Sequence, residues 1–207
     1  MLRIMSEVII ATKNQGKAKE FARMFQPLGF EVKTLLDFPD IQDVEETGTT
    51  FEENAVLKAE TISKVLGRMV IADDSGLAID ALDGRPGIFS ARYAGEDKND
   101  EANMNKVLKE LENVPDNERH ARFYCALAVA TPGQETFTVL GTCEGRILQE
   151  KRGSHGFGYD PIFFAVEKGK AMAELEPEEK AQISHRAHAL RKLESELPSL
   201  LAGAEKK

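Results

Sequence analysis

The chain has 207 residues, of which 30% are charged and 42% are hydrophobic, a composition typical of a globular protein. This length suits one domain, and we expect it over residues 6–200 in two lobes, with residues 201–207 as a C-terminal tail. The formal net charge of −8 provides no positive field for nucleic acid or for an anionic membrane. We therefore expect no nucleic-acid partner, and we expect local positive charge or a metal at any phosphate site.

Neither a membrane-spanning segment nor a secretory signal is expected. No apolar run approaches the roughly 20 residues that cross a bilayer. Cys125 and Cys143, the only cysteines, each lie in an apolar, strand-like run. We expect a reduced, cytoplasmic protein without a membrane partner. Because Met5 is a second methionine, the sequence leaves open whether residues 1–5 form an N-terminal extension.

The first predicted elements are a strand, a loop and a helix. Residues 8–11 form a continuous apolar run, as expected for a strand buried on both faces, and a helix follows from Gly16. The apolar side of this helix carries Phe21, Met24, Phe25 and Leu28. Residues 30–36 predict a second strand. This alternation is typical of an α/β protein.

The loop between the first strand and the first helix, ATKNQGKA at residues 11–18, partly matches a phosphate-binding P-loop. A P-loop needs Gly, four free residues and then Gly-Lys-Ser/Thr, and only Gly16 and Lys17 fit that pattern. Because a helix N-terminus attracts anions, Lys17 is a candidate phosphate ligand. The alternative is an ordinary turn with an exposed lysine, since lone lysines are mostly exposed.

An acidic loop at residues 43–50 leads to the next predicted helix. Thr50 and Glu53 have the spacing of a capping box. The apolar stripe of this helix consists of Phe51, Ala55, Ala59, Ile62 and Leu66. Glu53, Asn54 and Lys58 lie outside the stripe, so we expect these three side chains to face solvent or a cleft.

Two pairs of adjacent acids are candidate metal ligands. Glu45 and Glu46 belong to the acidic loop, and Asp73 and Asp74 follow a third strand, which we predict at residues 69–72 and expect to end there. A single acid in a loop is usually a turn former. Adjacent carboxylates, however, repel one another and are stabilised by a cation, and Mg²⁺ needs only one or two of them.

The second half of the chain is richer in strands. We predict a helix at residues 101–111 and an antiparallel hairpin formed by residues 121–131 and 135–142. A Gly-rich loop at residues 153–161 precedes another apolar run. One last helix begins near Pro177, and its apolar side carries Ile183, Ala187, Leu190 and Leu197. Together these elements predict an α/β fold with a mixed sheet in two lobes.

The sequence FGYD at residues 157–160 is a candidate base pocket. An aromatic ring can stack on a base while backbone groups and a carboxylate contact its edge, although aromatic residues before a strand are also commonly core residues. Lys180 and Arg186 are candidate phosphate or base contacts. His185 and His188 are three residues apart, but no Cys or third His lies near them in sequence, which argues against a zinc site.

Six motifs occur in order along the chain. They are TKNQGK at 12–17, EETGTTFEENA at 45–55, ADDSGL at 72–77, PGIFSARY at 86–93, GFGYDPIFF at 156–164 and SHR at 184–186. By these motifs the chain, from Ser6 to Leu197, closely resembles the inosine triphosphate pyrophosphatase family, the dITP/XTP pyrophosphatases that remove non-canonical purine nucleotides.

The resemblance implies an ITPase-like α/β fold with a long central mixed sheet, two lobes around a nucleotide cleft, and a homodimer. It also implies hydrolysis of ITP, dITP or XTP to the nucleoside monophosphate and pyrophosphate, with Mg²⁺ as the cofactor. In this family Asp74 is the proposed catalytic base, and it binds the metal together with Glu45 and the nearby Glu46. The residues expected to bind the substrate are Thr12, Asn14, Lys17, Lys58, Ser75, Phe157, Gly158, Tyr159, Asp160, Lys180, His185 and Arg186. Glu53 is expected in the shell around the phosphates and the metal.

Two alternatives stay open. A Maf-like nucleotide pyrophosphatase shares the fold and acts on other modified or pyrimidine nucleotides, but its match to FGYD and to the His185-Arg186 pair is expected to be poor. A catalytically silent nucleotide-binding protein is expected to lack an acidic ligand. All of the acids at positions 45, 46, 73 and 74 are present, which favours an enzyme.

Overall fold

The computed structural model describes residues 6–204. The N-terminal extension considered at residues 1–5, and the last three residues of the expected tail, lie outside the described residues. The chain divides into two compact units. Unit 1 comprises the described residues up to Asp74, those from Ala126 to Leu140 and those from Ala189 onward. Unit 2 comprises residues 75–125 and 141–188.

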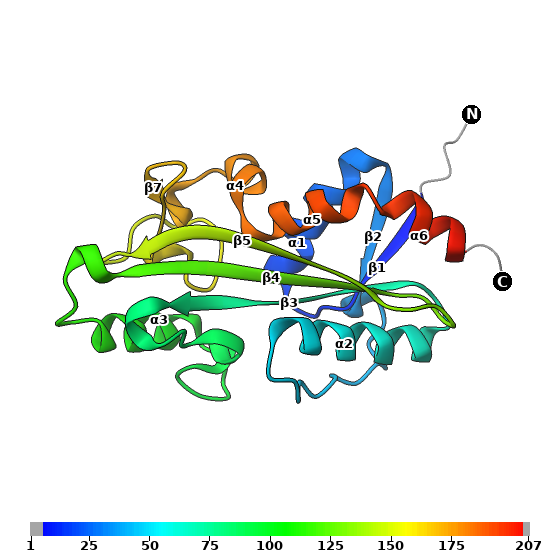
Figure 1. The fold of residues 1–207 in the computed structure, drawn as a ribbon, viewed down its shortest axis with the longest axis horizontal. Helices are drawn as coiled ribbons and strands as arrows, with labels where there is room; N and C mark the ends of the chain where they lie inside the picture. The colour runs from blue at the N-terminus through cyan, green and yellow to red at the C-terminus, as the bar shows by residue number, and fades with distance from the viewer. Residues whose placement is uncertain (1–5, 205–207) are drawn as a thin grey trace. The chain divides into compact units, whose positions relative to one another are not determined.

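Within residues 6–204, the strands form one seven-stranded sheet with the order β2-β1-β3-β4-β5-β6-β7 (Figure 1). The strands are β1 Ser6–Ile10, β2 Phe30–Thr34, β3 Val70–Ile79, β4 His120–Ala130, β5 Phe137–Ile147, β6 Phe163–Ala165 and β7 Lys170–Ala171. β1 pairs in parallel with β2 and β3, whereas β6 pairs antiparallel with β5 and β7. The connection between β4 and β5 is too short for a parallel crossover, so these two neighbouring strands form the predicted antiparallel hairpin. The predicted α/β fold with a mixed sheet is confirmed.

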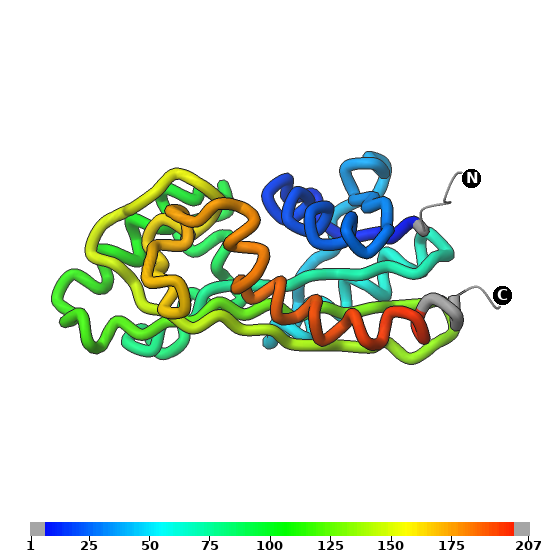
Figure 2. Tube along the Cα trace, turned by 90° about the horizontal axis from the view of Figure 1, so that it is seen from above, coloured from blue at the N-terminus to red at the C-terminus, as the bar shows by residue number. Residues whose placement is uncertain are grey.

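The helices flank the strands within each unit. They are α1 Gln15–Phe25, α2 Phe51–Leu66, α3 Asp100–Glu110, α4 Pro177–Ile183, α5 His185–Glu194 and α6 Leu197–Ala204. In unit 1, α2 and α6 lie on opposite sides of the strands, and in unit 2, α3 and α4 do so (Figure 1). In the second view, the yellow segment that precedes β6 runs beside the orange α4 (Figure 2). No helix among the described residues is long and apolar enough to cross a membrane.

The parts of β1, β3 and β4 that belong to unit 1 are buried on both faces. The residues that pack with α2 are Ile9, Ala11, Val70, Ala72, Ala126, Ala128 and Ala130. Side chains alternate between the two faces of a strand, so the intervening residues point to the opposite face. These are Val8, Ile10, Ile71, Leu127 and Val129, and all of them are buried. Burial on both faces explains why these parts of β1, β3 and β4 are apolar runs in sequence.

The prediction that the third strand ends before its two acids is wrong. β3 continues through Asp73 and Asp74 to Ile79, and the two aspartates are only 1% and 5% exposed. A buried carboxylate is tolerated only when it is paired or hydrogen-bonded. Lys17 and Lys58 lie beside this part of the strand and supply the compensating charge. The acids are therefore part of a buried strand rather than of a solvated loop.

The prediction of one last helix is also wrong. α4 ends at Ile183, and Ser184 has an extended backbone conformation with ψ of 157°. Its hydroxyl oxygen accepts a hydrogen bond from the Ala187 N–H at 3.1 Å, in the manner of an N-cap residue at the start of α5. The predicted apolar residues Ile183, Ala187, Leu190 and Leu197 are nevertheless all buried. The apolar pattern was sound, but the break at Ser184 was missed.

The start of α2 differs in one detail from its prediction. Thr50 accepts a hydrogen bond from the Glu53 N–H at 3.1 Å, as a capping residue does, and the Glu53 carboxylate interacts with the Thr50 backbone as well as accepting from Thr49. Asn54, which we expected to face solvent or a cleft, is buried, and its Oδ1 accepts from the Gly48 N–H at 2.8 Å. A Cβ on Gly48 would lie 2.6 Å from this oxygen, so the acidic loop folds tightly onto the helix.

Candidate functional site

The turn before α1 is organised by its own side chains. Asn14 caps α1, and its Oδ1 accepts from the Lys17 N–H at 2.9 Å. Thr12 is buried, and its Oγ1 accepts from the Asn14 N–H at 3.1 Å. The turn therefore lacks the glycine cradle of a P-loop but keeps the helix N-terminus that attracts anions.

Five residues in unit 1 form what we call the carboxylate–lysine cluster: Lys17, Glu46, Lys58, Asp73 and Asp74. Lys17 Nζ forms an ion pair with Asp73 Oδ1. Lys58 Nζ lies 2.6 Å from Glu46 Oε1 and donates a hydrogen bond to the Asp73 carbonyl oxygen at 3.1 Å. The cluster thus joins α1, the acidic loop, α2 and β3, which are far apart in sequence.

Burial sets the protonation of the cluster. Desolvation raises the pKa of Asp74 from 3.8 to about 6, against the lowering effect of Lys58 and Lys17, and the charges of Glu46 and Asp73 raise it further. Burial by itself lowers the pKa of Lys58, but Glu46, Asp74 and Asp73 outweigh that effect, so the pKa of this lysine is raised. Lys58 therefore remains charged, while the Asp74 carboxylate is held in a site that disfavours its negative charge.

The cluster fits a divalent cation that is also bound by phosphate. Among residues 6–204 there is no group of three or more potential metal ligands from Asp, Glu, His and Cys. Mg²⁺ in nucleotide sites, however, is typically held by one or two carboxylates together with the substrate phosphates. Glu46 and Asp74 provide hard oxygen ligands, and a cation would offset the cost of ionising Asp74.

Two other acids that the sequence suggested lie differently. Glu45 is exposed, whereas its neighbour Glu46 contacts Lys58. The Glu53 carboxylate accepts from the Thr49 N–H at 2.7 Å and from its hydroxyl at 2.9 Å, and these bonds lower the pKa of Glu53. In this structure Glu46 is therefore the loop acid that joins the cluster, and Glu53 shapes the loop.

A second group, in unit 2, forms what we call the aromatic–cation cluster: Phe157, Asp160, Lys180, His185 and Arg186. Asp160 Oδ2 accepts from the Phe157 N–H at 3.0 Å and from Lys180 Nζ at 2.5 Å. Lys180 Nζ lies 4.8 Å from the centre of the Phe157 ring, and Arg186 Cζ lies 5.6 Å from it. Two cations thus lie within cation–π distance of one aromatic ring.

The first turn of α5 fixes the remaining members of this cluster. The His185 ring stacks on Phe123, with the ring centres 4.8 Å apart and the planes inclined by 19°. Arg186 Nη2 donates to Ser75 Oγ at 2.7 Å, which places Ser75 beside the cluster. His188 Nδ1 lies 2.5 Å from the Thr142 carbonyl oxygen, so this histidine contacts β5.

The FGYD loop depends on its glycines and on a buried tyrosine. Gly156 has φ of +76°, and a Cβ there would lie 2.0 Å from Asp160 Oδ2, so only glycine fits. Gly158 also has a positive φ, +62°. Tyr159 is buried, and its hydroxyl donates to the Ser90 carbonyl oxygen at 2.7 Å. The Tyr159 ring is therefore a core residue, and Phe157 is the ring that remains partly exposed.

Sequence reasoning missed several residues that contact the candidate site. Asp73 was considered only as one of two acids, although it holds Lys17. Phe123, which stacks on His185, carried no signal beyond its place in an apolar strand. Ser90 lies in the PGIFSARY motif, to which no role was assigned. The presence of this motif, for which we had no role, was the one signal in the sequence that pointed to Ser90.

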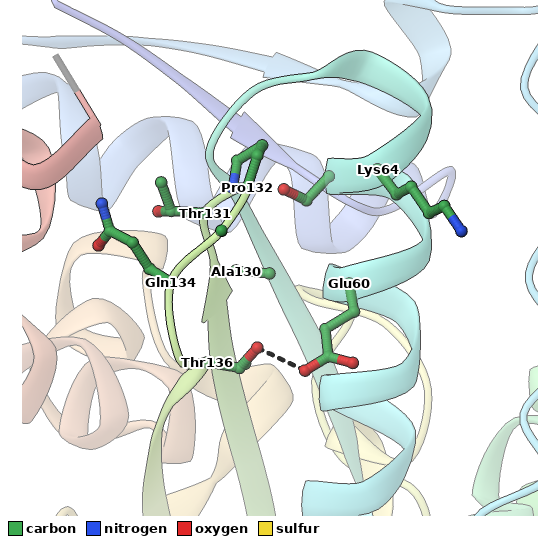
Figure 3. A pocket seen from close by; sticks show the side chains of 9 residues that line it. Glu60, Lys64, Ala130, Thr131, Pro132, Gln134 and Thr136 are labelled. Atoms are coloured by element: carbon green, nitrogen blue, oxygen red, sulfur yellow. Dashed lines mark hydrogen bonds between the residues drawn. The ribbon is translucent and has the colours of Figure 1, made fainter. Parts of the chain in front are cut away.

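A separate cavity of about 310 Å³ lies between α2 and the turn that follows β4 (Figure 3). The Glu60 and Thr136 side chains point toward each other there, and the Thr136 hydroxyl donates to Glu60 Oε1 at 2.6 Å. The lining residues include none of the predicted site residues. This cavity is therefore not the candidate site.

Comparison with known proteins gives a concordant set of matches. The model of the Ham1 family matches residues 8–196. A dITP/XTP pyrophosphatase of Geobacillus kaustophilus is 62% identical over 199 residues, which cover 96% of this chain and 98% of that protein. A dITP/XTP pyrophosphatase of Bacillus subtilis is 58% identical over 190 residues, which cover 92% of this chain and 96% of that protein.

Solved structures give the same result. The Ham1 protein of Staphylococcus aureus matches with a TM-score of 0.82 and 48% identity, covering 94% of this chain and 99% of that chain. A HAM1 protein of Coxiella burnetii matches with a TM-score of 0.83 and 41% identity, covering 94% of this chain and 100% of that chain. The similarity therefore extends over nearly the whole chain in sequence and in fold.

Proposed function

The chain belongs to the Ham1 family, and on that premise we propose that it hydrolyses the non-canonical purine nucleoside triphosphates ITP, dITP and XTP to the monophosphate and pyrophosphate. Relatives named dITP/XTP pyrophosphatase support this activity. The observation that carries the proposal is the carboxylate–lysine cluster, where two lysines and buried carboxylates meet around one strand. Charges of both signs in one place suit a substrate that arrives as a metal–triphosphate complex.

The unit 1 residues are assigned to the triphosphate. Lys17 and the N-terminus of α1 bind phosphate oxygens, and Thr12 and Asn14 hold the turn that presents them. Lys58, which the neighbouring acids keep charged against the effect of burial, binds a second part of the triphosphate. These lysines offset the charge that develops on the pyrophosphate leaving group.

Glu46 and Asp74 are assigned to Mg²⁺, with Glu45 as the further ligand that the family resemblance suggests. Bound there, Mg²⁺ would neutralise phosphate charge and polarise the phosphoryl group that is attacked. Hard carboxylate oxygens and a raised Asp74 pKa support this assignment.

Asp74 is assigned as the general base. A water molecule attacks the α-phosphorus, its proton passes to an Asp74 oxygen, and the bond to the bridging oxygen of pyrophosphate breaks. Without a cation, burial raises the pKa of Asp74 to about 6, above that of an exposed aspartate. Mg²⁺ bound to the same carboxylate would lower that proton affinity, so the assignment of Asp74 as base rests on the family resemblance.

The unit 2 residues are assigned to the base. Phe157 stacks on the purine, and Arg186, held by Ser75, lies close to the same ring. Lys180 or His185, or a backbone amide near Phe157, donates to the oxygen at position six of hypoxanthine or xanthine. Adenine carries an amino group there, so a buried donor would face another donor and remain unpaired.

Three expectations from the sequence are kept as part of this proposal: a single domain over residues 6–200, a homodimer, and a cytoplasmic location. Sedimentation of the purified protein tests the homodimer directly.

The activity itself is tested with ITP, XTP, dITP, ATP and GTP, each with and without Mg²⁺, by measuring pyrophosphate separately from orthophosphate. We expect metal-dependent pyrophosphate from the first three only. Orthophosphate as the sole product, or equal rates on all five, would contradict the proposal.

A further inference from the structure

The PGIFSARY motif at residues 86–93 has no part in the functions assigned above. It forms a 3-10 helix, Gly87–Arg92, that is fixed onto β3 through Ser90. The buried Ser90 Oγ accepts from the Leu77 N–H at 2.9 Å and donates to the Gly87 carbonyl oxygen at 2.6 Å. The backbone of Ser90 is therefore held in place by the strand that also carries Ser75.

This fixed backbone is in contact with the FGYD loop. The Ser90 carbonyl oxygen accepts the hydroxyl proton of Tyr159 at 2.7 Å, and Tyr159 is only 6% exposed. Burial raises the pKa of Tyr159, so the phenol is neutral and remains a donor at any pH at which the protein functions. A buried donor and its acceptor form a contact that is costly to break.

A second contact holds the residue before Tyr159. Asp100 is the first residue of α3, and its Oδ2 accepts from the Gly158 N–H at 2.9 Å. Gly158 has a positive φ, a conformation that only glycine adopts without strain, and Gly156 has one too. Two glycines give the loop a large choice of backbone conformations, so contacts from outside the loop are needed to select one.

We propose that Asp100 and Tyr159 are positioning residues, which fix the backbone of the FGYD loop and thereby the Phe157 ring for purine selection. Gly158 is held by α3, Tyr159 by the 86–93 motif, and Asp160 by Lys180. Phe157 is the one residue of the loop whose side chain is left to contact a ligand. This inference rests on the proposed function, because it names the residues that prepare the base site for its substrate.

The consequence is a separation between purine binding and phosphate chemistry. A loop that has lost one contact samples more conformations before binding, and ordering it reduces the affinity for the nucleotide. The carboxylate–lysine cluster belongs to unit 1 and shares no residue with the loop. We therefore expect KM for ITP to rise while kcat is retained.

The first test removes a hydroxyl. Tyr159→Phe deletes only the oxygen that contacts Ser90. Loss of one ordinary hydrogen bond corresponds to an increase of about five- to tenfold in KM for ITP, and to a similar fall in the preference for ITP over ATP. Tyr93→Phe is the matched control, because the Tyr93 hydroxyl contacts Glu110 and Arg85 and not the loop. We expect it to leave KM and the base preference unchanged.

The second test compares two acids in the first turn of one helix. Asp100→Ala and Glu101→Ala each remove one negative charge from the first turn of α3, and so cost the helix a similar amount. Glu101 pairs with Lys151, whereas Asp100 holds the loop. Asp100→Ala is expected to raise KM for ITP about fivefold, the effect of one lost hydrogen bond, and Glu101→Ala is not.

The assay includes inorganic tripolyphosphate as a competitive inhibitor, since it occupies the phosphate site without a base. Its inhibition constant should be the same in all four variants and in the wild type. Unchanged KM values with lowered melting temperatures, or an equal rise in the inhibition constant, would mean that the loop contacts are merely structural and would overturn the inference. A wild-type protein that fails to hydrolyse ITP would instead refute the proposed function, and the inference with it.

Discussion

Asp74→Asn should make the metal-free protein more stable while it abolishes turnover. Asp74 is 5% exposed, and its pKa is raised from 3.8 to about 6, mainly by burial. Ionised Asp74 therefore destabilises the folded state in the absence of a cation. Asparagine has the same shape without the charge, so the penalty disappears, but it can neither take a proton from water nor supply a carboxylate ligand.

The magnitude follows from the pKa. A rise from 3.8 to about 6 is worth about 3 kcal/mol at 1.36 kcal/mol per pH unit. The amide that replaces the carboxylate must still be buried, which takes back about 1–2 kcal/mol. We expect a net gain of about 1–2 kcal/mol in the free energy of unfolding, which corresponds to about 2–8 °C in Tm for a chain of this size.

The pH dependence has a definite sign. Because the pKa of Asp74 is higher in the folded state, the folded protein binds more protons than the unfolded chain between pH 3.8 and about 6. The contribution of Asp74 to the free energy of unfolding of the wild type is therefore most favourable at low pH and falls as the pH rises through that window. The advantage of Asp74→Asn should be larger at pH 8 than at pH 5, by about 1 kcal/mol.

The assay is thermal unfolding of both proteins at pH 5 and pH 8, in a chelator and again in Mg²⁺. Asp73→Asn is the contrasting variant, because it removes the partner of Lys17 and should lower the free energy of unfolding by about 1–3 kcal/mol. Mg²⁺ should stabilise the wild type more than Asp74→Asn. If Asp74→Asn melts below the wild type at pH 8 in chelator, the argument from desolvation is wrong.

Three further predictions concern other parts of the protein. Lys180→Met should weaken ITP turnover far more than ATP turnover and lower Tm by removing the partner of Asp160, and equal losses on both nucleotides would refute its role in base selection. Cys125 and Cys143 are both buried, and burial raises the pKa of Cys143 to about 12, so a thiol reagent at pH 8 should leave both unmodified in the native protein and modify both after denaturation. Asn14→Ala should cost about 1 kcal/mol as a lost helix cap, whereas Asn14→Asp should keep that stability and raise KM for ITP by repelling phosphate.

The elements with a strong local signal were predictable from sequence. Residues 8–11, which overlap the second half of β1, form an uninterrupted apolar run, and α2 has both an apolar stripe and a capping threonine, so each was placed close to its observed bounds. The hairpin of β4 and β5 was recognised from two long strand-like runs separated by a Pro-Gly turn. In each of these segments the local pattern and the tertiary fold favour the same conformation.

Features that the apolar pattern does not report were not predictable in the same way. Ser184 has the helix-forming neighbours of an ordinary helical residue, and only its cap on Ala187 shows that the helix restarts there. Asn54 is polar and outside the apolar stripe, yet it is buried because Gly48 folds back to donate to it. A periodic pattern reports which face of a helix is apolar, and does not report which polar side chain a loop will cover.

The two aspartates of β3 show how one such error affects the site. If the strand ended before Asp73, both acids would lie in a loop, and nothing in the sequence would give the two carboxylates different roles. In a strand that continues, side chains alternate, so Asp74 lies on the face of Val70 and Ala72, which α2 covers, and Asp73 lies on the other face.

Alternation thus explains why neighbouring acids differ in role. Asp73 pairs with Lys17 of α1. Asp74 lies on the face of β3 that α2 covers, near Lys58 of that helix, and Lys58 in turn pairs with Glu46. Of the two adjacent carboxylates, Asp74 is the one placed to act together with Glu46 on a cation. The ADDSGL motif alone does not separate these roles, but the same motif within a continuous strand does.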